Sequence, residues 1–195
     1  MNEDDELFNI DLDREFELLM QADKVRAKPG GVAVILTPVA EAADLAALMS
    51  LRGISGEVLS TQAGTIVWQR LAADESDPFD ALLGDERPIP PSVDALAAAL
   101  SEIIPYGVVV LMAWLESGDV EPGVSGQITA RRYVRGEAEE KLAAGLILNT
   151  CDPLVEDLLL GRVTPEDVDE SARAQTTGRF AAIKRLRRSL KERGW

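Results

Sequence analysis

The residue types that most often carry enzyme chemistry are scarce in this chain. Its 195 residues include no histidine and one cysteine, Cys151. Without histidine there is no histidine general base, no Ser-His-Asp or Cys-His nucleophile pair and no histidine-containing zinc site. A single cysteine forms neither an internal disulfide nor a thiolate metal cluster, and we interpret Cys151 as a small buried apolar residue. Any catalysis would therefore depend on carboxylates and arginines.

Carboxylates are abundant, but their spacing indicates no particular site. The chain has 34 Asp and Glu residues, and Asp74, Asp77 and Asp80 lie together in an acidic stretch. That stretch lacks the alternating ligands, central glycine and terminal glutamate of a calcium loop. No glycine-rich phosphate loop and no Gly-x-Ser-x-Gly elbow occurs in the sequence. We predict no catalytic residues, no metal site and no cofactor, and a carboxylate-based enzyme stays a minor alternative.

The strongest pattern is a reversal of charge along the chain. Residues 173–195 contain eight Lys or Arg and one Glu, a net of +7, and the whole chain carries −14, which leaves −21 for residues 1–172. A strongly acidic body therefore ends in a strongly basic segment. We expect this segment either to pack against its own body or to bind something anionic.

The basic segment is predicted to form an amphipathic helix. The apolar residues that share about one third of its circumference are Phe180, Ile183, Leu186 and Leu190. The cations on the neighbouring face are Lys184, Arg185, Arg188 and Lys191. Trp195 adds an apolar ring at the last position. We take these nine residues as the candidate partner-binding surface.

Three interpretations of this helix stay open. It docks on its own acidic body, or it enters a groove on a protein partner through its apolar residues. In the third interpretation it lies on nucleic acid or an anionic membrane. A homodimer is a further possibility, because the basic segment of one copy would complement the acidic body of another.

A secondary candidate surface lies on the strand predicted over residues 127–135. Period-two alternation places Arg131, Tyr133 and Arg135 on one face. Such a face could stack a nucleobase or bind phosphate. We favour pairing of these arginines with nearby acids, because a body of charge −21 repels nucleic acid.

Apolar periodicity and turn residues predict an α+β fold. The expected helices are 11–24, 37–51 with Thr37 as its N-cap, 92–104, 137–149, 153–160 and one from Thr164 onward. The expected strands are 32–36, 54–60, 65–71, 106–115 and 127–135. The order β-α-β-β-α-β in the middle is the split βαβ arrangement of ferredoxin-like domains. We therefore predict a mostly antiparallel sheet of about five strands with helices on at least one face, an N-terminal helix and a long basic C-terminal helix.

We predict one acidic domain over residues 1–164, with a mobile acidic loop at 72–91, and a C-terminal helical extension over 165–195. Residues 2–6 are acidic or polar where a secretory signal would be basic, and no apolar run approaches the roughly 20 residues of a membrane span. We therefore expect a cytoplasmic protein without a transmembrane segment. Together these features predict a non-enzymatic protein-interaction, regulatory or adaptor protein that uses the basic helix as a docking element.

Overall fold

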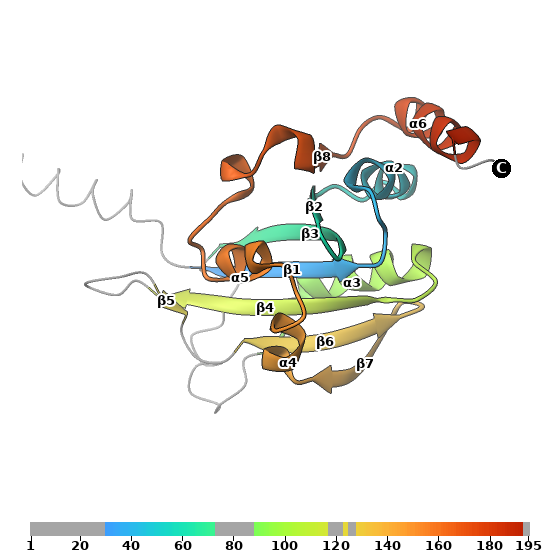
Figure 1. Cartoon of the computed structure of the whole chain (residues 1–195). Coiled ribbons are helices and arrows are strands. Elements are labelled where there is room, and N and C mark those ends of the chain that lie inside the picture. The colour runs from blue at the N-terminus through green and yellow to red at the C-terminus, as the bar shows by residue number, and fades with distance from the viewer. Residues whose placement is uncertain (1–29, 73–87, 117–122, 125–127, 193–195) are drawn as a thin grey trace, which may run out of the picture.

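The computed structural model is built around one antiparallel β-sheet (Figure 1). It describes residues 30–72, 88–116, 123–124 and 128–192. The strands are β1 (Gly31–Thr37), β2 (Glu57–Thr61), β3 (Gly64–Leu71), β4 (Val108–Glu116), β6 (Thr129–Val134), β7 (Glu137–Leu142) and β8 (Arg173–Gln175). They lie in the order β7-β6-β4-β1-β3-β2-β8, and the two-residue strand β5 (Gly123–Val124) pairs with β4. All the strand pairs are antiparallel.

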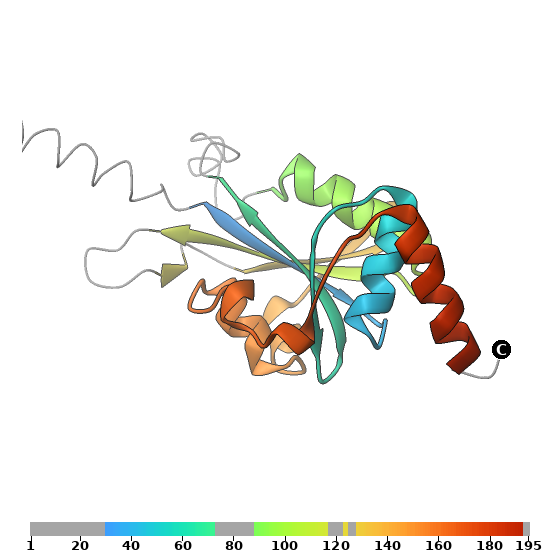
Figure 2. The same cartoon turned by 90° about the horizontal axis from the view of Figure 1, so that it is seen from above.

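Helices cover both faces of this sheet (Figure 2). They are α2 (Ala42–Arg52), α3 (Pro91–Ile103), α4 (Ala144–Leu148), α5 (Pro153–Leu159) and α6 (Arg179–Glu192). The first two pack on one face, and α4 and α5 lie against the other. The last helix, α6, packs along the outer side of α2 as an additional layer.

The central strand β1 is apolar on both sides because both of its faces are covered. Ala33 and Ile35 belong to the core beneath α2 and α3, and both are fully buried. Val32 and Val34 belong to the second core, which α5 closes. The sequence therefore shows a continuous apolar run in β1 and no alternation.

The sheet is larger than the predicted five strands, and one reason is the segment after β6. Residues 137–149 were expected to form a helix, but they form β7 followed by the short helix α4. The cause is a two-residue turn in which Arg135 (φ 54°) and Gly136 (φ 84°) both have left-handed backbone conformations. That turn geometry matches the twist of a β-hairpin, and it pairs Val134 with Glu137. The charged side chains of β7 suit an exposed edge strand.

The helix expected from Thr164 onward is also absent over residues 164–178. Thr164 caps the single 3₁₀ turn Pro165–Asp167, where its backbone N–H and its hydroxyl both donate to the Asp167 carboxylate. A second 3₁₀ turn, Glu170–Ala172, leads into β8. Because β8 pairs with β2, this part of the predicted C-terminal extension belongs to the sheet.

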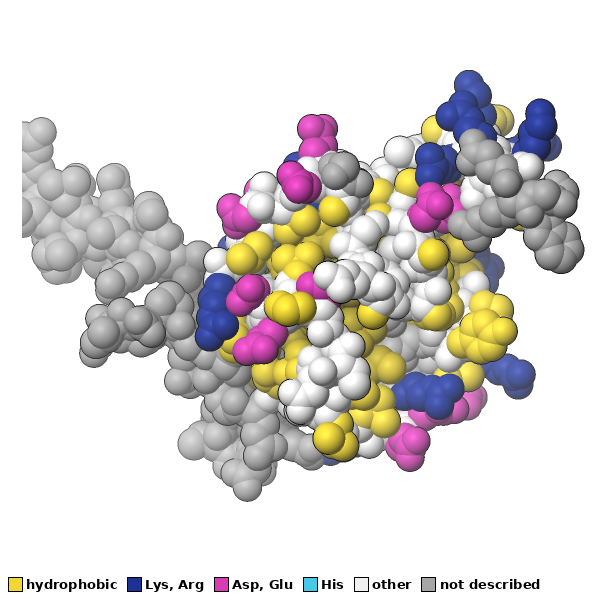
Figure 3. Space-filling model, in the orientation of Figure 1, with side chains coloured by type: hydrophobic (Ala, Val, Ile, Leu, Met, Phe, Trp, Pro, Cys, Tyr) yellow, Lys and Arg dark blue, Asp and Glu magenta, His cyan; other side chains and the backbone are white. Residues whose placement is uncertain are grey.

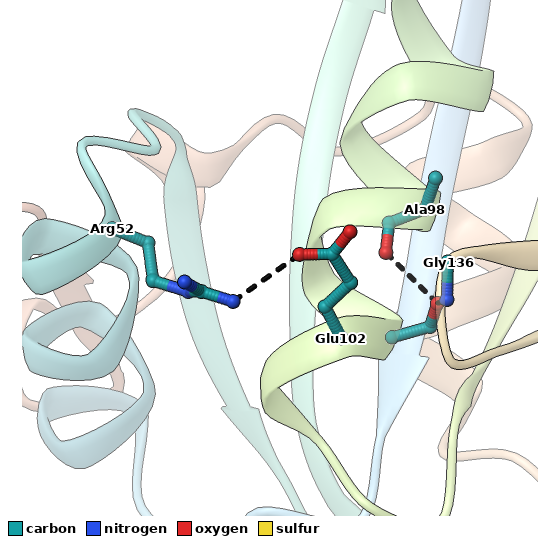
Figure 4. Close-up of polar contacts among 5 residues, drawn as sticks. Arg52, Ala98, Glu102 and Gly136 are labelled. Carbon is teal, nitrogen blue, oxygen red and sulfur yellow. Dashed lines mark hydrogen bonds and ion pairs between the residues drawn. The ribbon is translucent and has the colours of Figure 1, made fainter.

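Polar contacts tie α3 to its neighbours (Figure 4). The Arg52 guanidinium at the end of α2 pairs with the Glu102 carboxylate of α3 at 3.2 Å. Ser101 donates its hydroxyl to the Ala98 carbonyl at 2.8 Å and accepts the Gly136 N–H at 2.8 Å. The β6–β7 turn is thereby fixed to the C-terminal half of α3.

Three predicted features lie outside the described residues. They are the helix at 11–24, most of the acidic loop at 72–91 and Trp195. Among the residues that are described, no helix has both the length and the apolar character that spanning a bilayer requires.

Candidate functional site

The basic helix α6 is held against α2 by small and polar residues. Ala182 and Ser189 are buried in this contact. The Ser189 hydroxyl donates a 2.7 Å hydrogen bond to the Asp44 carboxylate in the first turn of α2. At the other end, Thr177 donates its backbone N–H to Ser50 near the end of α2. The two helices therefore run antiparallel.

Arg185 adds the charged part of this contact. Its guanidinium lies 3.1 Å from the Glu41 carboxylate and 3.5 Å from the Asp44 carboxylate. Asp44 has a side chain that is only 8% exposed, and its position at the helix N-terminus also favours a negative charge. The buried Asp44 carboxylate is therefore stabilised by the Ser189 hydroxyl, the Arg185 guanidinium and the positive end of the α2 dipole.

The predicted apolar residues of α6 do not form this docking face. Phe180, Ile183 and Leu190 are 92%, 40% and 54% exposed, and Leu186 is half-buried. With about 100° of rotation per residue, the face of Ala182 and Ser189 lies roughly a quarter turn from Ile183 and Leu190. Docking therefore leaves an apolar ridge on α6, formed by Phe180, Ile183 and Leu190, open to solvent.

Cations flank this ridge. Lys184, Arg188 and Lys191 are exposed, whereas Arg185 is half-buried against α2. Lys and Arg side chains gather over α6 in the space-filling view (Figure 3). Of the nine residues proposed from the sequence, the structure therefore places seven on or beside the outer surface of α6. Arg185 serves the docking contact, and Trp195 lies outside the described residues.

The second candidate surface, on β6, is not an exposed stacking face. Tyr133 is fully buried, and its hydroxyl donates a 2.7 Å hydrogen bond to the Asp94 carboxylate of α3. Burial, followed by the bond to Asp94, raises the pKa of the Tyr133 hydroxyl well above its usual range, and the Arg131 guanidinium acts in the opposite direction. Arg135 lies in the hairpin turn, separated from the half-buried Arg131. The three residues therefore do not act as one exposed surface.

Groups that could serve as nucleophiles or metal ligands are not assembled in the described part of the chain. Cys151 is half-buried, and burial, together with the nearby Asp152 charge, raises the pKa of its thiol, which disfavours the reactive thiolate. Within the described ranges no three metal-ligating side chains cluster. Asp74, Asp77 and Asp80 lie outside those ranges.

Comparison with protein-family models, curated proteins and solved structures finds no match for this chain. The functional interpretation therefore depends on the geometry of the chain itself.

Sequence reasoning named Arg185 but missed Ala182 and Ser189, the two small residues that dock α6. Ala182, Arg185 and Ser189 stand at i, i+3 and i+7, which is the spacing of one helical face. Two of the three are small, and small residues allow close approach of the helices. The pattern was visible in the sequence, but the larger apolar side chains on the adjacent face concealed it.

Proposed function

We propose that this chain is a non-enzymatic cytoplasmic protein-interaction or regulatory protein, and that α6 is its docking element. The observation that carries the proposal is the division of α6 into two faces. One face, with Ala182 and Ser189, is buried on α2, and the other presents Phe180, Ile183 and Leu190 to solvent. A helix held in place while apolar side chains stay exposed is a preformed surface, which lowers the entropic cost of binding.

The chemistry of this surface supports a proposal for the kind of partner that it would bind. Single exposed apolar residues are common on proteins, but these three share one helix and lie beside exposed cations such as Lys184 and Lys191. Apolar side chains supply affinity in a groove, and flanking charges supply orientation and association rate. We propose a protein partner that offers an apolar groove bordered by carboxylates. A second copy of this chain is one form of such a partner.

An anionic surface is the second candidate, and the exposed cations of α6 favour it. Arg179, Lys184, Arg187, Arg188 and Lys191 are all exposed. Cations flanking apolar side chains are also the pattern of helices that lie on anionic lipid, and cations alone bind nucleic acid phosphates. This alternative predicts a steep loss of binding with added salt.

We also propose that the elements from β1 to β4 form a ferredoxin-like split βαβ unit. Its support is the chain order β1-α2-β2-β3-α3-β4 together with the spatial order β4-β1-β3-β2 within the larger sheet. This relation concerns architecture alone, because one fold serves many functions.

The test replaces the apolar ridge and leaves the docking face intact. In the variant Phe180→Ser/Ile183→Ser/Leu190→Ser we expect partner binding to fall by at least about tenfold, since exposed anchors are lost. Partners are captured from native lysate by the full chain, identified and then titrated in purified form. The variant's unfolding free energy is expected to change little, because the substituted side chains are exposed.

Leu146→Ser is the matched control, because Leu146 is 70% exposed but belongs to α4. Partners lost in the ridge variant, kept in the control and resistant to nuclease and moderate salt support a protein partner. Binding that salt, nuclease or removal of anionic lipid abolishes supports the second candidate. A dimer on light scattering that the ridge variant dissociates identifies the partner as another copy. Equal binding by the ridge variant and the full chain contradicts the proposal.

A further inference from the structure

A cavity of about 450 Å³ lies at the side of the sheet where α3, β6 and β7 meet, away from α6. Its volume is in the range of sites for small organic molecules. Part of its wall is apolar, with Ile89, Ile128 and Leu142. The rest carries charged and polar groups from α3, β6 and β7.

Two cations face each other across this wall. Arg131 of β6 and Lys141 of β7 are direct partners in the antiparallel ladder, and both line the cavity. Like charges placed directly opposite each other on neighbouring strands destabilise a sheet. An anion bound between them would interact favourably with both cations.

Buried donors in the same wall lack hydrogen-bond acceptors. The Nε–H of Arg131 and the hydroxyl of Thr129 are both buried, and neither atom has a hydrogen-bond partner among the described residues. A buried donor without an acceptor costs about 1–3 kcal/mol, and more when it is charged. Both residues line the cavity, so a ligand within it can supply the missing acceptors.

The carboxylate in the wall is already engaged. Asp94 accepts the hydrogen bond of the buried Tyr133 hydroxyl. Burial and this bond to Asp94 keep Tyr133 protonated, so the hydrogen-bond donor to Asp94 is a neutral hydroxyl. The lining residues of the cavity therefore carry two positive charges and one negative charge.

We propose that this cavity binds a small organic carboxylate. The guanidinium of Arg131, the ammonium of Lys141 and the hydroxyl of Thr129 hold the carboxylate, whose two oxygens suit the planar guanidinium. Ile89, which packs with the core on the Tyr133 and Arg131 side of the sheet, covers the apolar body of the ligand. This site is separate from the α6 ridge and does not depend on the function proposed for it.

The test compares ligands that share one apolar chain and differ in their head group. Hexanoate, hexanol, hexyl phosphate and hexylammonium are titrated into the ¹⁵N-labelled full chain, and amide chemical shifts are followed. Hexanoate is expected to shift amides of residues 129–131 and 141–142 and to bind about tenfold or more tightly than hexanol, because hydrogen bonds to charged groups are the strong ones. Hexylammonium is expected to leave these amides unshifted. Tighter binding of hexyl phosphate than of hexanoate would overturn the choice of carboxylate.

The variant Arg131→Gln removes the guanidinium, and we expect it to weaken hexanoate binding by about tenfold or more. Arg132→Gln is the matched control, because Arg132 is the next residue of β6, is exposed and pairs with Glu139 on the surface. Lys141→Gln, at an exposed position of β7, provides a second measurement of hexanoate binding if Arg131→Gln fails to fold. Equal affinity for hexanoate and hexanol, or unchanged hexanoate binding in both Arg131→Gln and Lys141→Gln, would overturn the proposal.

Discussion

Replacing Ser189 with alanine tests how α6 is held on the body. Ser189 is buried against α2, and its hydroxyl donates to the Asp44 carboxylate at 2.7 Å. The substitution removes this donor and leaves the ion pair of Asp44 with Arg185 in place. The exposed apolar ridge is untouched. The variant therefore isolates one contact of the docking face.

The expected cost follows from the burial and the charge of this hydrogen bond. A hydrogen bond to a charged group contributes about 1.5–3 kcal/mol. Alanine has a higher helix propensity than serine, which offsets about 0.5 kcal/mol of this loss. The net loss is then about 1–2.5 kcal/mol, which is a factor of about 5 to 70 in the docking equilibrium.

Hydrogen exchange measures this equilibrium directly. A helix of 14 residues such as α6 is marginal in water by itself, so undocking exposes its amides. In Ser189→Ala the amides of α6 are expected to exchange about 5 to 70 times faster. Amides of β1, in the middle of the sheet, are expected to change much less.

Arg188→Ala is the control, because Arg188 is the neighbouring residue but is exposed. It is expected to change exchange in α6 by little. Equal acceleration in Ser189→Ala and Arg188→Ala would refute the reasoning, because the loss would then come from helix charge or propensity and not from the contact with Asp44.

Two further predictions concern buried hydrogen bonds of the body. The hydroxyls of Thr37 and Thr65 share a buried 2.7 Å hydrogen bond, so each single change to valine is expected to cost about 1–3 kcal/mol. The double variant should cost less than the sum of the two, and additive losses in urea unfolding would contradict this coupling. The pKa of Tyr133 is higher in the folded chain than in the unfolded one, so its stabilising contribution is complete below the usual tyrosine pKa of about 10 and is lost as pH rises above it. Unfolding free energy should therefore fall more steeply above pH 10 in the native chain than in Tyr133→Phe, and parallel profiles would exclude this role.

The α+β class and the antiparallel sheet were predictable from the sequence because their periodic signals are local. The run Val32–Leu36 was recognised as a buried strand, and the structure has β1 at Gly31–Thr37. The helix expected at 92–104 is α3 at Pro91–Ile103. In both segments the apolar pattern and the packing agree.

The errors occur where a tertiary contact decides the local structure. Residues 137–149 contain strong helix formers, but the turn at Arg135 and Gly136 directs the chain back along β6 as β7. Thr37 was expected to cap the next helix, but its hydroxyl bonds to Thr65 in the neighbouring strand, and α2 begins at Ala42. A cap residue and a cross-strand partner present the same hydroxyl, so sequence alone does not distinguish them.

The candidate surface on α6 was predictable only in part, for a related reason. The sequence identified the apolar residues but not which face of the helix the body would cover. Docking uses Ala182 and Ser189, and the larger Phe180 stays 92% exposed. Side-chain size was therefore a poor guide to burial here, because the close approach of α6 to α2 favours small residues.

Docking of α6 does not account for the charge reversal that the sequence shows. Residues 179–192 contain six Lys or Arg, yet among the described residues the α6 cation that forms ion pairs with the body is Arg185. The other five cations are exposed and contribute little to stability there. If α6 only completed the fold, Ala182, Arg185 and Ser189 would be enough to hold it against α2. The excess positive charge on its outer surface therefore favours a role in recognition, because exposed charge sets the rate and orientation of association more than it stabilises a fold.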